Sequence, residues 1–189
     1  MVINRWSTTF TASTMRIRTL LIAPNSFKGS LRASECARAM AAGARDAVPD
    51  VRTILHPLSD GGEGLVEVLA DALGADLVRT GVSGPLPDQR VQAVWAMSAD
   101  RDLAIIEMAS AAGLMLVPED RRDPKTTTTY GVGELIREAL NRGASSIIIG
   151  IGGSATNDGG AGMAEALGVR FLDKQGTLLP RGGIHLRNL

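Results

Sequence analysis

The chain has 189 residues, enough for one domain or for a domain with part of a second, and its 44% hydrophobic content is typical of a globular protein. Twenty basic and twenty acidic residues cancel to a formal net charge of zero, which argues against a nucleic-acid-binding domain. Cys36 is the single cysteine, so no internal disulfide can form, and no apolar run approaches the ~18 residues of a membrane span, so we expect a cytoplasmic protein that binds no membrane.

The first segment, residues 1–14, is rich in serine and threonine and has no continuous apolar stretch. A secretory signal needs such a stretch, so we expect a non-native or disordered extension instead. Met15, just before the first apolar strand, is the expected natural start.

Two strand–loop–helix units follow within residues 15–75. Apolar strands are expected at 19–23 and 51–55, and each leads through a polar, glycine-bearing loop into apolar positions at 3.6-residue spacing. Gly74 is the expected C-cap of the second helix. Alternating strands and helices predict an α/β protein with a mostly parallel sheet, whose functional loops lie at the carboxyl ends of its strands.

A different pattern marks residues 76–125. Two strand candidates, 91–97 and 103–108, are joined by the turn-prone residues 98–101. This arrangement predicts an antiparallel hairpin, which would suit a second or inserted domain.

The last segment, residues 126–189, returns to the first pattern. It has an apolar helix stripe from Val132 to Leu140, a buried strand at 145–151, a glycine-rich loop, a short helix and a further strand at 169–172.

The loop from Gly150 to Gly160 is the strongest candidate for chemistry. Glycines let backbone N–H groups converge on an anion, the hydroxyls of Ser154 and Thr156 can donate to phosphate oxygens, and Asp158 can hold Mg²⁺ or accept a hydroxyl proton. A tight strand-to-helix connection capped by Asn157 or Asp158 is the alternative.

The same loop also fits the dinucleotide fingerprint G-x-G-x-x-G/A, with Asp173 about where a ribose-binding acid would lie. A nicotinamide or flavin oxidoreductase is therefore an alternative function.

Other polar residues follow the expected strands. Asp60 and Glu63 can bind a metal–phosphate group or simply stabilise the start of a helix. Lys28 is either a solvated loop residue or a cation for a transferred phosphoryl group. Glu107, at the end of an apolar strand, must be paired or face a cleft, while Ser110 and Thr128 can be helix caps or substrate donors.

Five segments in register resemble the bacterial glycerate kinase family, and they span about residues 17–175. They are Ile22–Leu31, Asp60–Gly64, Ile106–Leu114, Thr127–Ile136 and Gly150–Gly160. The resemblance implies ATP-dependent phosphorylation of D-glycerate with Mg²⁺, by a flavodoxin-like domain into which a second α/β domain is inserted. Because family members are about twice as long, the resemblance also implies a truncated chain that is an inactive fragment, a remnant or half of a split protein.

The predicted site follows from the residues and the resemblance together. We predict Lys28, Asp60 and Asp158 as catalytic residues and Asp60 and Asp158 as metal ligands. The predicted substrate- and phosphate-binding residues are Asn25, Ser26, Gly61, Gly62, Glu63, Glu107, Ser110, Thr128, Gly152, Gly153, Ser154, Thr156 and Asn157.

Overall fold

The computed structural model describes residues 17–27 and 29–189, so the predicted extension 1–14, Met15 and Lys28 lie outside the described residues. In chain order the strands and α-helices are β1 (Thr19–Ile22), α1 (Ala33–Ala47), β2 (Arg52–Leu55), α2 (Leu65–Leu73), β3 (Asp76–Ser83), β4 (Arg90–Met97), β5 (Leu103–Glu107), α3 (Ala109–Ala112), α4 (Tyr130–Asn141), β6 (Ser146–Gly150) and α5 (Ala161–Ala166). Short 3-10 helices occur at η1 (Leu114–Leu116), η2 (Glu119–Arg121) and η3 (Gly183–Asn188).

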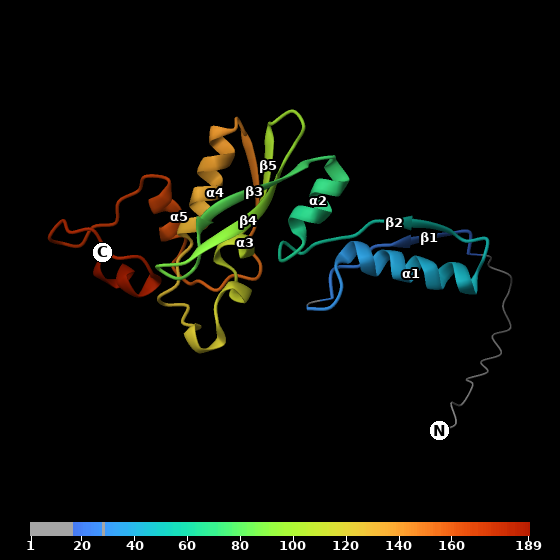
Figure 1. Cartoon of the computed structure of the whole chain (residues 1–189), viewed down its shortest axis with the longest axis horizontal. Coiled ribbons are helices and arrows are strands. Elements are labelled where there is room, and N and C mark those ends of the chain that lie inside the picture. The colour runs from blue at the N-terminus through green and yellow to red at the C-terminus, as the bar shows by residue number, and fades with distance from the viewer. Residues whose placement is uncertain (1–16, 28) are drawn as a thin grey trace, which may run out of the picture.

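The described residues of 19–58 form a small lobe that extends from one side of the rest of the molecule (Figure 1). Its strands β1 and β2 pair in parallel, with Leu21 opposite Ile54. Because side chains alternate along a strand, Leu20 and Ile22 point to α1 and pack against its alanines, while Leu21 and Ile54 point to the opposite face.

Residues 65–189 form a large lobe around a four-stranded sheet in the order β3-β4-β5-β6. The β3–β4 and β4–β5 pairs are antiparallel, and the β5–β6 pair is parallel. Helix α2 covers one face of this sheet and α4 the other (Figure 1). Ile105 packs beneath α2, whereas Trp95 and Ile106 lie in the main core beneath α4, so the central strands are covered on both faces.

The predicted α/β class is therefore confirmed, as are the helices over 33–47 and 65–73 and the antiparallel hairpin of β4 and β5. Gly74 ends α2 in the left-handed conformation that the C-cap prediction requires. Parallel pairing is limited to β1–β2 and β5–β6, because the strands divide over two sheets and the larger sheet is mixed.

Two local expectations differ from the structure. The predicted strand at 169–172 does not form, and only a single bridge joins Leu172 to Leu178. Strand β3 was not predicted, because it carries Asp76, Arg79 and Gly81 and lies at the sheet edge, where apolar alternation is weak. The predicted segments 76–125 and 126–189 share one sheet, since β5 pairs directly with β6.

Candidate active site

A cavity of about 920 Å³ lies between the two lobes. From the small lobe it is lined by α1 and the loop that precedes it, and from the large lobe by α2, β3, β4 and the end of β5. Four of the predicted site residues face it: Ser26, Glu63, Glu107 and Ser110. The structure thus brings together residues that the sequence separates by more than eighty positions.

The glycine loops that follow β2 and β6 lie in direct contact. The backbone N–H of Gly152 donates to the carbonyl of Gly61 at 2.9 Å. A side chain on Gly152 would place its Cβ 2.7 Å from the Cα of Gly62, which is closer than real Cβ atoms approach. Glycine is therefore required here because two backbones meet, and the strand ends converge as their order in the chain predicts.

Glu107 lies at the end of β5 and is 9% exposed. One of its carboxylate oxygens, Oε1, accepts a hydrogen bond of 2.7 Å from the backbone N–H of Val66, in the first turn of α2. Burial raises the pKa of Glu107, and the N–H groups of Val66 and Gly64 oppose that shift in part. Glu107 therefore both lines the cavity and fixes the start of α2 to the sheet.

Three arginines of the cavity were not singled out from the sequence. Arg32 pairs with Glu67 at 2.8 Å and so links the two lobes at the cavity. Arg38 from α1 and Arg79 from β3 also line it, and within the described part of the chain neither forms an ion pair. No motif marks them, because each is an isolated cation whose position depends on how the lobes pack.

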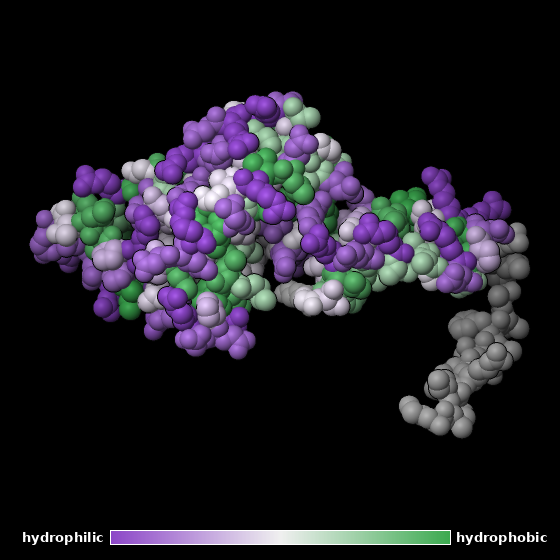
Figure 2. Space-filling model, viewed as in Figure 1, coloured by the Kyte–Doolittle hydropathy of each residue, from purple (hydrophilic) through white to green (hydrophobic). Residues whose placement is uncertain are grey.

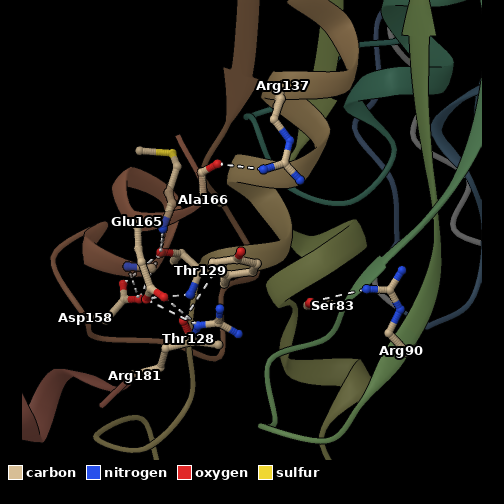
Figure 3. A network of polar contacts seen from close by, with 12 residues as sticks. Ser83, Arg90, Thr128, Thr129, Arg137, Asp158, Glu165, Ala166 and Arg181 are labelled. Atoms are coloured by element: carbon tan, nitrogen blue, oxygen red, sulfur yellow. Dashed lines mark hydrogen bonds and ion pairs between the residues drawn. The ribbon is translucent and has the colours of Figure 1, made fainter. Parts of the chain in front are cut away.

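Asp158 occupies a different environment, shown in Figure 3. The residue is 2% exposed, and its carboxylate accepts hydrogen bonds from the backbone N–H groups of Thr129, Gly160 and Gly162 and from the Thr129 hydroxyl. Asp158 lines neither the interlobe cavity nor a second, smaller cavity within the large lobe. These contacts fix the glycine-rich loop to the start of α4, and the expected roles of Asp158 as base and metal ligand stay predictions.

The hydroxyls of the glycine-rich loop face a second, smaller cavity of about 160 Å³. Ser154 and Thr156 line it together with Arg122, and their two hydroxyl oxygens lie 2.8 Å apart. The loop therefore does not present these side chains to the larger cavity. Their predicted phosphate contacts, like those of Gly153 and Asn157, stay predictions.

The remaining predicted residues form hydrogen bonds within their own loops. Asn25 Oδ1 accepts a hydrogen bond of 2.7 Å from the backbone N–H of Ser26, and Asp60 Oδ1 accepts one of 3.1 Å from Gly62. Thr128 is buried, and its hydroxyl accepts from the backbone N–H of Tyr130. Their roles toward a substrate stay predictions, and the predicted role of Lys28 falls outside the described residues.

The dinucleotide alternative lacks the local structure that its fingerprint requires. After β6 ends at Gly150, no helix begins until Ala161, so the fingerprint does not open a helix. Asp173 does not follow a strand either, since the chain from 169 to 172 forms only one bridge. The nicotinamide or flavin interpretation is therefore wrong.

Residues 17–27 and 29–189 hold no group of three or more His, Cys, Asp or Glu side chains placed to bind a metal ion. No helix among them is long and apolar enough to cross a membrane.

Comparison with known proteins gives a consistent result. The model of the glycerate kinase family matches residues 20–189. A glycerate kinase from Halalkalibacterium halodurans is 49% identical over 92% of this chain and 45% of its own length. The glycerate 2-kinase of Escherichia coli K12 is 50% identical over 90% of this chain and 44% of its own length.

A solved structure shows the same relationship. A crystal structure provisionally assigned as glycerate kinase 2 from Salmonella typhimurium LT2 superposes with a TM-score of 0.77 at 50% identity. The match covers 92% of this chain and 46% of that one. The chain thus spans about half the length of the relatives that it matches.

Proposed function

The chain belongs to the glycerate kinase family, and from that premise we propose that its interlobe cavity takes part in the ATP-dependent phosphorylation of D-glycerate. The observation that carries the proposal is the convergence of Ser26, Glu63, Glu107 and Ser110 from separate elements on one cavity.

Phosphoryl transfer from ATP needs positioning and charge neutralisation more than covalent chemistry, since a substrate hydroxyl attacks the γ-phosphorus directly. Arg38 and Arg79 line the cavity without an ion-pair partner among the described residues, so they can offset negative charge on the triphosphate or on the glycerate carboxylate. The hydroxyls of Ser26 and Ser110 would orient the substrate. Lys28, on the same loop as Ser26, would add a further cation.

Family membership implies Mg²⁺, and the oxygen chemistry around the Asp60–Gly64 loop fits it. Mg²⁺ is bound by one or two carboxylates together with waters and phosphate oxygens, so it does not require a preformed cluster of three acidic residues. Glu63 faces the cavity, and Asp60 lies on the same loop, so these two side chains would hold the ion. When bound, Mg²⁺ neutralises charge on the nucleotide phosphates.

The proton of the attacking hydroxyl needs an acceptor, and Asp60 and Asp158 are the proposed candidates. Neither side chain lines the interlobe cavity in this structure, so either would have to reach it through a movement of its loop. Asp158 already accepts hydrogen bonds from Thr129, Gly160 and Gly162, so the role of base requires part of that network to open. In a full-length family member, Asn at the position of Asp158 or Ala at that of Lys28 should lower turnover about 10²-fold or more. Wild-type turnover in both variants would remove these two roles.

Calorimetry on the 189-residue chain tests the binding part of the proposal. ATP with Mg²⁺ should bind and NAD should not, and Arg38→Gln should weaken ATP binding. Arg142→Gln is the matched control, because Arg142 pairs with Glu138 on α4 and does not line the cavity. Failure of the wild-type chain to bind either ATP or glycerate would contradict the proposal.

Turnover is a separate matter, since the chain spans about half of each relative. We therefore expect the 189-residue chain alone to show little or no glycerate kinase activity. Robust ATP consumption with glycerate would contradict this expectation.

A further inference from the structure

The second cavity of the large lobe is separate from the interlobe cavity, and no described residue lines both. Leu116 in η1 faces the interlobe cavity, whereas Leu114 in the same short helix and Val117 just after it face the second cavity. The rest of its lining comes from residues 122–124 and 154–156. A ligand of the second cavity would therefore be held by a different set of residues from those that face the interlobe cavity.

Main-chain hydrogen bonds hold the walls of the second cavity together. The N–H of Leu114 donates to the carbonyl of Gly153 at 2.9 Å, and the N–H of Ala155 donates to the carbonyl of Ala112 at 2.8 Å. Val117 and Ala155 belong to one buried apolar cluster and form the apolar part of the lining. The cavity is therefore preformed, as ligand sites usually are.

Arg122 supplies a positive charge to this cavity. Its Nε donates to the carbonyl of Val117 at 3.3 Å, which orients the guanidinium relative to the apolar wall. Its Nη1 lies 3.7 Å from Oε1 of Glu119, whose side chain is 88% exposed, so this ion pair is weak. A guanidinium has five N–H donors in a planar fork, and most of them are left for a ligand. This geometry suits a carboxylate or a phosphate.

Two hydroxyls of the glycine-rich loop add neutral donors. The hydroxyl oxygens of Ser154 and Thr156 lie 2.8 Å apart, and a single hydrogen occupies the space between them. The hydrogen of the other hydroxyl can therefore point to a ligand. The cavity also has one carboxylate, that of Asp123, whose Oδ1 accepts a hydrogen bond of 3.0 Å from the N–H of Lys125. Oδ2 of Asp123 lies 4.0 Å from Nζ of Lys125, so the negative charge is offset within its own loop.

We propose that the second cavity is a binding site for a small oxyanion, with the guanidinium of Arg122 and the hydroxyls of Ser154 and Thr156 as its donors. The ligand class is inorganic phosphate or the carboxylate of an acid of about three carbons. The volume of about 160 Å³ equals that of about five water molecules at ~30 Å³ each, which is too small for a nucleotide. This site is therefore distinct from the interlobe cavity to which ATP is assigned.

The surface around the cavity allows such a ligand to enter from solvent. Arg122 is exposed and directly follows η2. Figure 2 shows hydrophilic side chains along the lower edge of the large lobe, where Figure 1 places the yellow segment that contains η2.

The test measures binding rather than catalysis, so it is independent of the proposed reaction. The isotope-labelled 189-residue chain is titrated with inorganic phosphate and, separately, with D-glycerate at constant ionic strength, and its backbone amides are followed by NMR. At least one of the two ligands should shift the amides of Arg122, Ser154 and Thr156 along a saturable curve. Tighter binding of phosphate would assign the site to phosphate groups, and tighter binding of glycerate would assign it to carboxylates.

Variants of the donors identify the site. Arg122→Gln should raise the Kd about tenfold or more, because a charge-assisted hydrogen bond to the anion is lost. Thr156→Val keeps the shape of the side chain and removes the hydroxyl, so it should raise the Kd several-fold. Thr156→Val carries the test alone if the spectrum of Arg122→Gln shows that this variant does not fold.

Two matched controls separate this site from other cations. Arg121→Gln removes an exposed charge next to Arg122 that lines neither cavity, so it should leave the Kd unchanged. Arg38→Gln changes the interlobe cavity and should also leave the titration of these amides unchanged. An absent effect of Arg38→Gln on ATP binding would count against the proposed function alone.

Two results would overturn the proposal. The first is the absence of a saturable shift of the Arg122, Ser154 and Thr156 amides with both ligands. The second is a Kd that Arg121→Gln raises as much as Arg122→Gln does, or that neither Arg122→Gln nor Thr156→Val raises.

Discussion

Within residues 17–27 and 29–189 two strand pairs are parallel, β1–β2 in the small lobe and β5–β6 in the large lobe, and they differ in how they are covered. In β5 every residue from Ala104 to Glu107 is buried, because α2 covers one face of the sheet and α4 the other. In β1 only Ile22 is buried, and β2 has no buried residue. The same local pattern of apolar strand, glycine loop and helix therefore gives a complete core in one lobe and half of one in the other.

This difference indicates which parts of the chain carry its stability. The main core of the large lobe joins residues from β3, β4, β5, α3 and α4, whereas that of the small lobe consists of Ile22, Ala37 and Ala41 with Leu20 beside them. We expect the large lobe to determine the free energy of unfolding of the chain and the small lobe to open at little cost.

Truncation of a core side chain in the large lobe should have the largest effect on the free energy of unfolding. Trp95 is fully buried, and its indole N–H donates to the Thr80 hydroxyl at 2.9 Å. Trp95→Ala should lower the free energy of unfolding by about 3–5 kcal/mol, since it leaves a cavity and an unpaired hydroxyl. Leu21→Ala in the small lobe should change it by less than about 0.5 kcal/mol. Urea denaturation checks both values, and similar losses would contradict the comparison.

A glycine-to-alanine change should lower stability at one position in the large lobe and raise it at one position in the small lobe. Gly152→Ala places a Cβ 2.7 Å from the Gly62 backbone, so it should destabilise by about 1–3 kcal/mol. Gly43→Ala lies within α1 with nothing within 4 Å of the added Cβ, so it should stabilise that helix by about 0.5–1 kcal/mol. Thermal unfolding measures the first effect, and hydrogen exchange of α1 amides measures the second. A stabilising Gly152→Ala would show that the two loops are not held together.

The buried carboxyl of Glu107 should make the stability of the large lobe depend on pH. Burial raises the pKa of Glu107, and the charges of Glu63 and Glu67 raise it further, so the native state holds this proton more tightly than the unfolded chain. The contribution of Glu107 to stability is then fully present below its usual pKa and is lost as pH rises through the raised value. Glu107→Gln should remove this decline in a pH series of unfolding measurements, and an unchanged profile would contradict the assignment.

The ion pair between Arg32 and Glu67, which links the lobes, should contribute least to the free energy of unfolding. Arg32 and Glu67 are both exposed, and such pairs usually add less than about 1 kcal/mol. Arg32→Gln should therefore leave the urea midpoint almost unchanged. A loss as large as that of Trp95→Ala would show that the two lobes unfold as one unit.

The sequence predicts local structure well where the spacing of apolar residues agrees with the positions of turn and capping residues. The helix from Ala33 to Ala47, the Gly74 cap and the β4–β5 hairpin follow from apolar spacing and turn residues. Strand β3 could not be found in this way, because its residues are ordinary edge-strand residues and pairing with β4 alone holds them in place. The pattern at 169–172 was apolar enough for a strand, yet its only partner is Leu178 at one bridge.

The residues of the candidate site likewise fall into those that local sequence predicts and those that depend on tertiary packing. Ser26, Glu63, Glu107 and Ser110 could be predicted because they lie at the end of a strand or in the segment that follows one, and such segments converge in α/β proteins. Arg38 and Arg79 could not, because their place at the cavity depends on how α1 and β3 pack across the lobes. Asp158 had the residue type of a base, but only the structure shows that Thr129, Gly160 and Gly162 already donate to its carboxylate.

Native-state hydrogen exchange on the 189-residue chain tests the contrast between the lobes most directly. The amides of Ile105 and Ile106 in β5 should exchange only through global unfolding, whereas those of β1 and β2 should exchange orders of magnitude faster. Equal protection of both strand pairs in the isolated chain would contradict the account.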